Sequence, residues 1–259
     1  MRAAVLGQPI AHSLSPMLHR AAYAALGLAW TYDAIEVDVA GLEAFLDQLG
    51  ADWAGLSLTM PLKQAVLPLL DSCSELATAV AAANTVVLGA GRRHGHNTDV
   101  VGMVVALREA GVTTARSPVV LGGGATARSA LAALAELGCR TPVLVVRSHP
   151  TETLAAAARL GVSPTVAPFT PRLLDDCDLL ISTLPASVAD PFGPHVHDIP
   201  VLLDVVYDPW PTALSAGCGG VVVSGASMLL HQAAAQVELM TGRPAPLDVM
   251  RDALAGLKA

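Results

Sequence analysis

Three consecutive glycines, residues 122–124, separate a short apolar segment from an alanine-rich segment with helical spacing. Val119–Leu121 predicts a buried strand, and Ala125–Leu134 predicts a helix directly after the glycines. Together with Ala127, the first and third glycines give the spacing Gly-x-Gly-x-x-Ala of a dinucleotide site. Glycine permits the tight turn and the close approach of a pyrophosphate, and the N–H groups of the helix start attract phosphate. Because such a spacing also arises by chance, the residues around it decide whether it indicates a dinucleotide site.

A second apolar segment, Pro142–Val146, ends in Arg147 and Ser148. A site for NAD would place Asp or Glu here, about 20 residues after the glycines, to bind the ribose hydroxyls. A guanidinium instead suits the 2′-phosphate of NADP, with which it forms bidentate hydrogen bonds. The alternative is that Arg147 is only a solvated residue after a strand.

Apolar segments alternate with helical segments from residue 119 onward, which predicts a parallel sheet covered on both faces. The expected strands are 119–121, 142–146, 164–167, 178–182, 201–205 and 220–223. The first 95 or so residues predict a separate α/β unit. Its expected strands are 3–6, 31–37, 54–58, 84–88 and 93–96, and its expected helices are 15–26, 41–49 and 61–82.

Helix 100–110 is expected between these two parts, and helices 226–240 and 247–257 are expected at the end of the chain. The last two have no strand between them, so we expect them to return to the first unit. Ser15 and Pro16 are typical of a helix start, with Ser15 as N-cap and Pro16 as the first helical residue.

Composition excludes several classes of protein. The chain has 259 residues, of which 53% are hydrophobic and 14% charged, so a sizeable core is expected rather than disorder. A net charge of −7 without a Lys/Arg cluster argues against nucleic-acid binding. Four scattered cysteines suggest neither zinc nor disulfides, and fit a reducing cytoplasm. Residues 209–237 contain no Asp, Glu, Lys or Arg, but their prolines and glycines indicate buried interior rather than a membrane span. The apolar run at the N-terminus is too short for a signal peptide.

Lys63 and Asp99 are candidates for proton transfer. Lys63 falls in the first turn of a predicted helix, where the helix dipole disfavours an ammonium group, so its placement invites a functional explanation. Asp99 precedes an apolar helix and is also a good N-cap, a role compatible with a partnership with Lys63. The alternative for Lys63 is a solvated lysine at a helix start.

Other polar residues admit more than one role. Ser13 has no evident capping role, whereas Asn84 and Thr85 are turn formers or ligand contacts. Gln232 lies inside an apolar helix, where a polar group needs a partner or solvent. The pairs His94/His96 and His195/His197 lack further ligands at useful spacing, so no metal site is expected.

Six segments, in this order, resemble the motifs of shikimate dehydrogenases, NADP-dependent enzymes that interconvert 3-dehydroshikimate and shikimate in aromatic amino-acid biosynthesis. The segments are Gly7–Pro16, Thr59–Lys63, Ala83–Thr85, Asn97–Asp99, Asp204–Pro209 and Gly225–Gln232. The resemblance extends over nearly the whole chain.

The resemblance implies a substrate domain (residues 1–98 and 225–259), a Rossmann-like NADP-binding domain (residues 99–224) and a ligand cleft between them. It implies that Lys63 and Asp99 are the catalytic residues. The substrate-binding residues that it implies are Ser13, Ser15, Thr59, Asn84, Tyr207 and Gln232. The NADP-binding residues that it implies are Gly122, Gly123, Gly124, Ala125, Thr126, Arg147, Ser148 and Gly225.

Two departures from the family pattern stand out. Ser57 replaces the usual Asn of an Asn-Val-Thr segment, and so loses an amide. Val146-Arg147-Ser148 replaces the usual Asn-Arg-Thr, but the arginine and a hydroxyl remain, so NADP is still favoured.

The expected activity is therefore reversible hydride transfer between NADP and the shikimate ring hydroxyl, by a monomer or homodimer in the cytoplasm without nucleic-acid or membrane partners. Two alternatives remain open at this stage. The substrate could instead be quinate or aminoshikimate, which differ by single groups. The fold could also serve an NADP-sensing module without turnover, although such a module would not need both Lys63 and Asp99.

Overall fold

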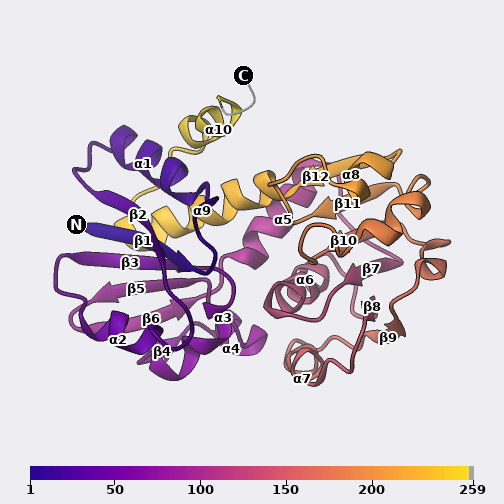
Figure 1. The fold of residues 1–259 in the computed structure, drawn as a ribbon, viewed down its shortest axis with the longest axis horizontal. Helices are drawn as coiled ribbons and strands as arrows, with labels where there is room; N and C mark the ends of the chain where they lie inside the picture. The colour runs from indigo at the N-terminus through magenta and orange to yellow at the C-terminus, as the bar shows by residue number, and fades with distance from the viewer. Residues whose placement is uncertain (257–259) are drawn as a thin grey trace. The chain divides into compact units, whose positions relative to one another are not determined.

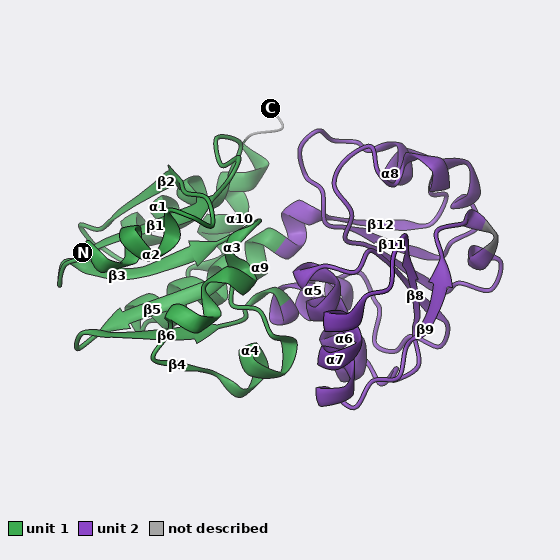
Figure 2. Ribbon diagram, turned by 60° about the horizontal axis from the view of Figure 1, so that its bottom comes forward, with its two compact units in different colours: residues 1–99, 229–259 green, residues 100–228 purple. Residues whose placement is uncertain are grey.

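The structure, a computed structural model, describes residues 1–256 and divides the chain into two compact units (Figure 2). Unit 1 comprises residues 1–99 and 229–259, and unit 2 comprises residues 100–228. The chain leaves unit 1 within helix α5 (Asp99–Glu109) and returns to it within helix α9 (Gly225–Thr241). Each unit has its own six-stranded sheet.

The sheet of unit 1 is mixed. Its strands are β1 (Arg2–Gly7), β2 (Thr31–Glu36), β3 (Trp53–Leu58), β4 (Ser72–Cys73), β5 (Thr85–Gly89) and β6 (Arg92–His96). Their order is β2-β1-β3-β5-β6-β4. β1 pairs in parallel with β2 and β3, whereas β5 runs antiparallel to β3 and forms the expected hairpin with β6.

Helices cover both faces of this sheet (Figure 1). They are α1 (Ser15–Ala25), α2 (Leu42–Asp47), α3 (Leu62–Ala65), α4 (Glu75–Val80) and α10 (Leu247–Ala255), together with most of α9. Alternate residues of β1 point to opposite faces. Ala3 and Val5 pack with residues of α1, α9 and α10, whereas Ala4 and Leu6 pack with residues of α2 and α3.

The prediction of a single helix over residues 61–82 is wrong. This segment contains α3, a 3₁₀ turn (Leu67–Leu69), the short strand β4 and α4. Pro68 has no N–H group to donate inside a helix, and Ser74 starts a new one by accepting a hydrogen bond from the Ala77 N–H at 3.2 Å.

Unit 2 is built on a fully parallel sheet, as the sequence predicts. Its strands are β7 (Pro118–Leu121), β8 (Val143–Val146), β9 (Thr165–Pro168), β10 (Leu179–Ser182), β11 (Val201–Asp204) and β12 (Val221–Ser224). The order β12-β11-β10-β7-β8-β9 is that of a Rossmann sheet. The strand order reverses between β7 and β10, and ligands of such sheets bind at the carboxyl ends of the strands there.

The connections of unit 2 are helices and 3₁₀ turns. They are α6 (Ala125–Glu136), α7 (Thr151–Arg159), η2 (Pro171–Leu174), η3 (Asp190–His195) and α8 (Ala213–Gly217). A core cluster that includes Leu180, Leu202, Phe192 and Leu214 lies between the sheet and η3 and α8. Residues 209–237 form α8, β12, most of α9 and their connections, and no described helix is long and apolar enough to cross a membrane.

The two C-terminal helices return to unit 1 as predicted, since Leu230 and Val237 of α9 and Met250 of α10 lie in its core. The expected end of the last helix, Leu257, lies outside the described residues.

Candidate active site

Four segments of unit 1 converge at one edge of its sheet because of the strand directions. β1 and β3 are parallel, so the loops that follow them leave from the same edge. β5 is antiparallel to β3 and therefore starts at that edge, and β6 ends there. The segments brought together are Gly7–Ser15, Thr59–Lys63, Asn84 and Asn97–Asp99.

Lys63 and Asp99 form an ion pair at this edge, with 2.6 Å between Nζ and Oδ2. Their side chains are 14% and 5% exposed, so the pair is largely removed from water. An isolated buried charge is strongly unfavourable, and each member of the pair offsets the desolvation of the other. Lys63 is therefore not a solvated helix-start lysine.

Asn84 orients the carboxylate of this pair. Its Nδ2 donates to Asp99 Oδ1 at 2.8 Å, while its Oδ1 accepts from the Thr98 N–H at 2.7 Å. Asn84 Nδ2 also lies 3.3 Å from Gln232 Oε1, which α9 supplies. Asn84 and Gln232 are both buried. Gln232, the polar residue predicted inside an apolar helix, is thus paired with Asn84.

The N-cap role expected for Ser15 is wrong. α1 begins at Ser15, and the cap position falls on Leu14, which makes no side-chain cap bond. Ser15 is already the first helical residue, and its side chain is buried, so its hydroxyl does not occupy the cap position. Ser13 supports the helix start instead, because its Oγ accepts from the Ser15 N–H at 3.3 Å.

Tyr32 begins a chain of buried hydrogen bonds toward Asn84. Its O–H donates to Ser57 Oγ at 2.6 Å, and Ser57 Oγ donates to Gln236 Oε1 at 2.7 Å. Gln236 Nε2 then donates to Thr85 Oγ1 at 2.9 Å and to the Asn84 carbonyl at 3.2 Å. Tyr32 and Asn84 thus belong to one hydrogen-bonded network.

His19 closes this network from the side of α1. Its ring stacks on Tyr32 with 3.9 Å between centroids, and its Nε2 donates to Gln236 Oε1 at 3.2 Å. Burial lowers the pKa of His19 to about 3, so its ring is neutral at physiological pH. Burial also raises the pKa of the Tyr32 phenol, which therefore stays protonated.

Thr59 is held at the same edge by its backbone. Its N–H donates to the Leu6 carbonyl at 2.9 Å, and its carbonyl accepts from the Leu62 N–H at 2.8 Å, at the start of α3. Gly7 is packed so tightly against Thr59 that any Cβ at Gly7 would overlap its methyl group.

The glycine segment of unit 2 lies at the carboxyl end of β7, next to the point where the strand order reverses. Gly122 has φ +109°, which L side chains rarely adopt, and a Cβ there would meet Thr183 Oγ1 at 2.5 Å. A Cβ on Gly124 would meet nothing within 4 Å, and Gly124 is the N-cap of α6. Ala127 is fully buried, as close helix–strand packing requires.

Arg147 and Ser148 follow β8, the neighbour of β7, and are exposed. The Arg147 guanidinium lies 5.8 Å from the centre of the Phe169 ring, a cation–π contact that keeps it beyond the sheet edge. Gly225 begins α9 with its Cα so close to the Val205 carbonyl that a side chain would overlap that carbonyl. These residues and the glycine segment all leave the same edge of one parallel sheet.

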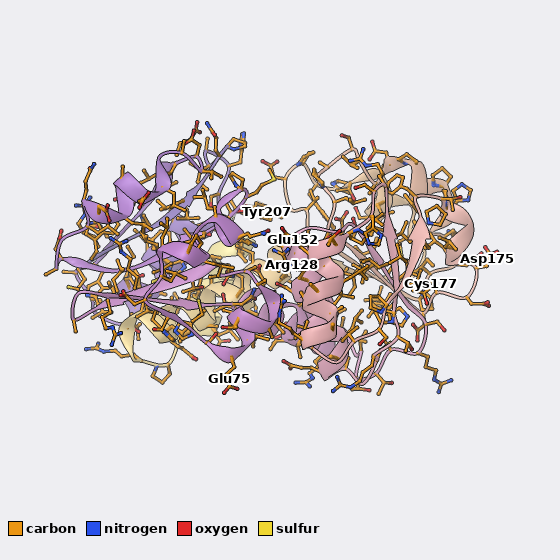
Figure 3. The ribbon with its side chains drawn as sticks, turned by 90° about the horizontal axis from the view of Figure 1, so that it is seen from below. Glu75, Arg128, Glu152, Asp175, Cys177 and Tyr207 are labelled. Carbon is orange, nitrogen blue, oxygen red and sulfur yellow. The ribbon has the colours of Figure 1, made fainter. Side chains whose placement is uncertain are left out.

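Tyr207 belongs to unit 2 and is half-buried in the loop after β11 (Figure 3). Asp204 anchors this loop by accepting from Thr212 Oγ1 at 2.7 Å and from the Val206 N–H at 3.3 Å. Burial raises the pKa of Asp204. The loop that carries Tyr207 is therefore fixed at its base.

The histidine pairs gather no metal ligands in the described part of the chain, which holds no group of three such side chains. His94 Nδ1 instead lies 2.6 Å from Ser72 Oγ across the β4–β6 pair.

Sequence reasoning missed Tyr32, Thr98 and Gln236. Thr98 stands between two residues that the motif analysis singled out, and Gln236 lies one helical turn after Gln232, so both had a local signal. Tyr32 had none, because its partner Ser57 is 25 residues away.

The chain is similar to known proteins over most of its length. The model of the shikimate dehydrogenase substrate binding domain matches residues 5–86, and that of the shikimate 5′-dehydrogenase C-terminal domain matches residues 225–255. The shikimate dehydrogenase (NADP(+)) of Moorella thermoacetica is 37% identical over 270 residues, which cover 95% of this chain and 90% of the relative.

The fold of the chain is also similar to that of solved structures. The shikimate dehydrogenase of Mycobacterium tuberculosis superposes with a TM-score of 0.91 at 43% identity, covering 98% of this chain and 99% of that one. Shikimate 5-dehydrogenase of Thermus thermophilus, in complex with NADP(H) and shikimate, has a TM-score of 0.85 at 31% identity and covers 99% of both chains.

The buried, neutral His19 predicts a pH-dependent stability. Unfolding restores the ordinary pKa of 6.5, so the unfolded chain binds a proton that the folded chain refuses until about pH 3. The contribution of His19 to the free energy of unfolding is therefore fully present above pH 6.5, and it is lost as the pH falls from 6.5 toward 3. Between about pH 7.5 and about pH 5, we expect the free energy of unfolding to fall by about 2 kcal/mol more in the natural protein than in His19→Gln. Urea unfolding at both pH values measures this, and equal losses would contradict it.

Proposed function

The chain belongs to the shikimate dehydrogenase family, and from that premise we propose that it catalyses the reversible NADP-dependent reduction of 3-dehydroshikimate to shikimate. The single observation that carries the proposal is the buried Lys63–Asp99 pair, with 2.6 Å between Nζ and Oδ2. Reduction of a ketone needs a proton for the oxygen as hydride reaches the carbon, and the reverse reaction needs a group to accept that proton.

Lys63 fits the proton-transfer role. Its ammonium is a donor to the developing alkoxide, and the resulting amine accepts the hydroxyl proton in the reverse direction. Asp99 holds the ammonium in place with one carboxylate oxygen while Asn84 fixes the other oxygen. The pair is nearly dry, which strengthens its electrostatic effect on the reacting oxygen.

The residues of unit 2 fit NADP. When bound, NADP supplies the hydride acceptor and NADPH the hydride donor. Gly122–Thr126 would hold the pyrophosphate, since Gly124 is open to close approach and the first N–H groups of α6 follow it. Arg147 and Ser148 would hold the 2′-phosphate, and Gly225 would lie against the cofactor.

The remaining site residues would bind the substrate. Three positions in the converging loops of unit 1, Ser13, Ser15 and Thr59, would take the carboxylate end and a ring hydroxyl. Asn84 and Gln232, which lie beside the ion pair, would contact the reacting end of the ring. Tyr207 would be a further substrate contact, as the family resemblance implies. We expect the protein to act in the cytoplasm, which fits the absence of any disulfide among its described cysteines.

The experiment that tests this function compares initial rates of cofactor reduction with shikimate or quinate, each with NADP or NAD. Turnover with shikimate and NADP above the other three pairs supports the proposal. Preference for quinate would keep the fold and the ion pair but change the substrate, and preference for an amine-bearing analogue would indicate aminoshikimate. Tight NADP binding without turnover of any cyclohexene carboxylate would favour a sensing module.

Removing the Lys63 ammonium should abolish proton transfer. We expect Lys63→Ala to lower kcat by about 10²–10⁴-fold while the KM for shikimate changes far less. Lys63→Arg is the matched control, because a guanidinium can keep the ion pair with Asp99 but does not give up its proton. Steady-state kinetics should therefore show both variants impaired. Full kcat in Lys63→Arg would reduce the pair to a structural role.

Arg147→Ala should weaken NADP much more than NAD. Losing a charged hydrogen bond to a phosphate corresponds to about 10–100-fold in Kd, and NAD lacks that phosphate. Arg140→Ala is the matched control, since Arg140 precedes β8 and so lies at the other end of that strand. Calorimetric titration of each variant with both cofactors measures the difference. Equal losses for NADP and NAD would tell against the 2′-phosphate assignment.

A further inference from the structure

The first turn of α7 is hydrogen-bonded to the glycine segment of unit 2. Thr153 donates from Oγ1 to the Gly123 carbonyl at 2.6 Å, across 30 residues of chain. Thr153 is 1% exposed, so its hydroxyl is shielded from water, whereas the acceptor residue Gly123 is exposed. A buried hydroxyl that donates to the carbonyl of one exposed glycine in a turn indicates that it helps to fix the conformation of that turn.

The direction of this bond fixes a second group. In a trans peptide the C=O of one residue and the N–H of the next point in opposite directions. The Gly123 carbonyl is directed to Thr153, so the Gly124 N–H is directed away from α7. Gly124 is exposed, and a Cβ there would meet nothing within 4 Å, so the turn is open at this residue. Thr153 therefore sets the orientation of the Gly124 amide donor.

Two other contacts hold α7 in the position from which Thr153 acts. Glu152 Oε2 lies 3.3 Å from Nη1 of Arg128, whose buried side chain belongs to α6 (Figure 3). Pro150 lies under the turn, with its Cβ 3.3 Å from where a Cβ of Gly123 would stand. Pro150, just before α7, and Glu152 and Thr153, in its first turn, thus pack on the glycine segment and on the helix that follows it.

We propose that Thr153 is a positioning residue for the cofactor: it presets the Gly124 N–H, through the Gly123 peptide, toward the pyrophosphate of NADP. This inference rests on the proposed function only in that it takes the glycine segment as the pyrophosphate site. Glycine has the largest conformational freedom of any residue, so a turn of three glycines has an entropic cost of ordering when phosphate binds. A buried hydrogen bond that orders one of its peptides in advance lowers that cost.

The role predicts a selective loss of affinity. Thr153→Val keeps the shape of the side chain and removes the hydroxyl, and should raise the Kd of NADP and of NAD alike by about tenfold. Thr153→Ser keeps a hydroxyl and should restore affinity to within about threefold of the natural protein. Thr151→Val, two residues earlier on the exposed side of the same helix, is the matched control and should leave both Kd values unchanged.

Adenosine 2′-monophosphate separates this role from general damage, since it carries the 2′-phosphate but no pyrophosphate. Calorimetric titration should show that Thr153→Val binds it as the natural protein does, whereas Arg147→Ala binds it more weakly. Thermal unfolding of each variant checks folding, and Thr153→Ala takes the place of Thr153→Val if the valine variant does not fold.

Two results would overturn the inference. One is an unchanged Kd of NADP in Thr153→Val and Thr153→Ala. The other is a loss of adenosine 2′-monophosphate binding as large as the loss of NADP binding, which would mean that the whole connection is disturbed. If instead the natural protein bound neither NADP nor adenosine 2′-monophosphate, the proposed function itself would fail.

Discussion

The buried ion pair of Lys63 and Asp99 imposes the strongest requirement on unit 1. Two charges withdrawn from water are tolerated only if they are paired and their remaining hydrogen-bonding capacity is met. Asp99 accepts from Lys63 with one oxygen and from Asn84 with the other. These three residues come from three connections, so the strands that precede or follow them must end at one edge. The mixed sheet of unit 1, with β5 antiparallel to β3, provides that edge.

Unit 2 meets a different requirement with a different sheet. A polyphosphate needs several backbone donors at one place, and a parallel sheet supplies them where strands end and helices begin. In the turn proposed for this role only glycine fits at position 122, because φ is +109° there and a Cβ would meet Thr183. The conformational freedom that admits the ligand would also loosen the turn. The hydrogen bond from Thr153 to Gly123 restores order there.

Much of the fold can be predicted from local sequence. The hydrogen-bond partners that hold the candidate site residues in place cannot. The apolar runs of unit 2 fall within a residue or two of its strands because each is short, continuous and bounded by polar residues or turns. The spacing of residues 61–82 predicts one helix, but Pro68 has no N–H to donate inside it, and the segment divides there. The Ser15-Pro16 pattern is typical of an N-cap followed by the first helical residue, yet α1 already begins at Ser15. The residues proposed for catalysis carry motif signals, whereas Tyr32 and Thr153 act through partners that no local pattern reveals.

Ser57 shows how such distant partners compensate for a departure from a family pattern. Serine is shorter than the Asn that the family usually has there, and it carries a hydroxyl instead of an amide. A cavity or an unpaired buried polar group at this position would lower the stability of the fold. Here the Tyr32 hydroxyl donates to Ser57, and Ser57 donates to Gln236, so both capacities of the small side chain are used. Gln236 supplies an amide from α9 instead, and passes the constraint on to Asn84 and Thr85. Since Asn84 orients Asp99, hydrogen bonds through residues of β2 and α9 link Ser57 of β3 to the buried ion pair.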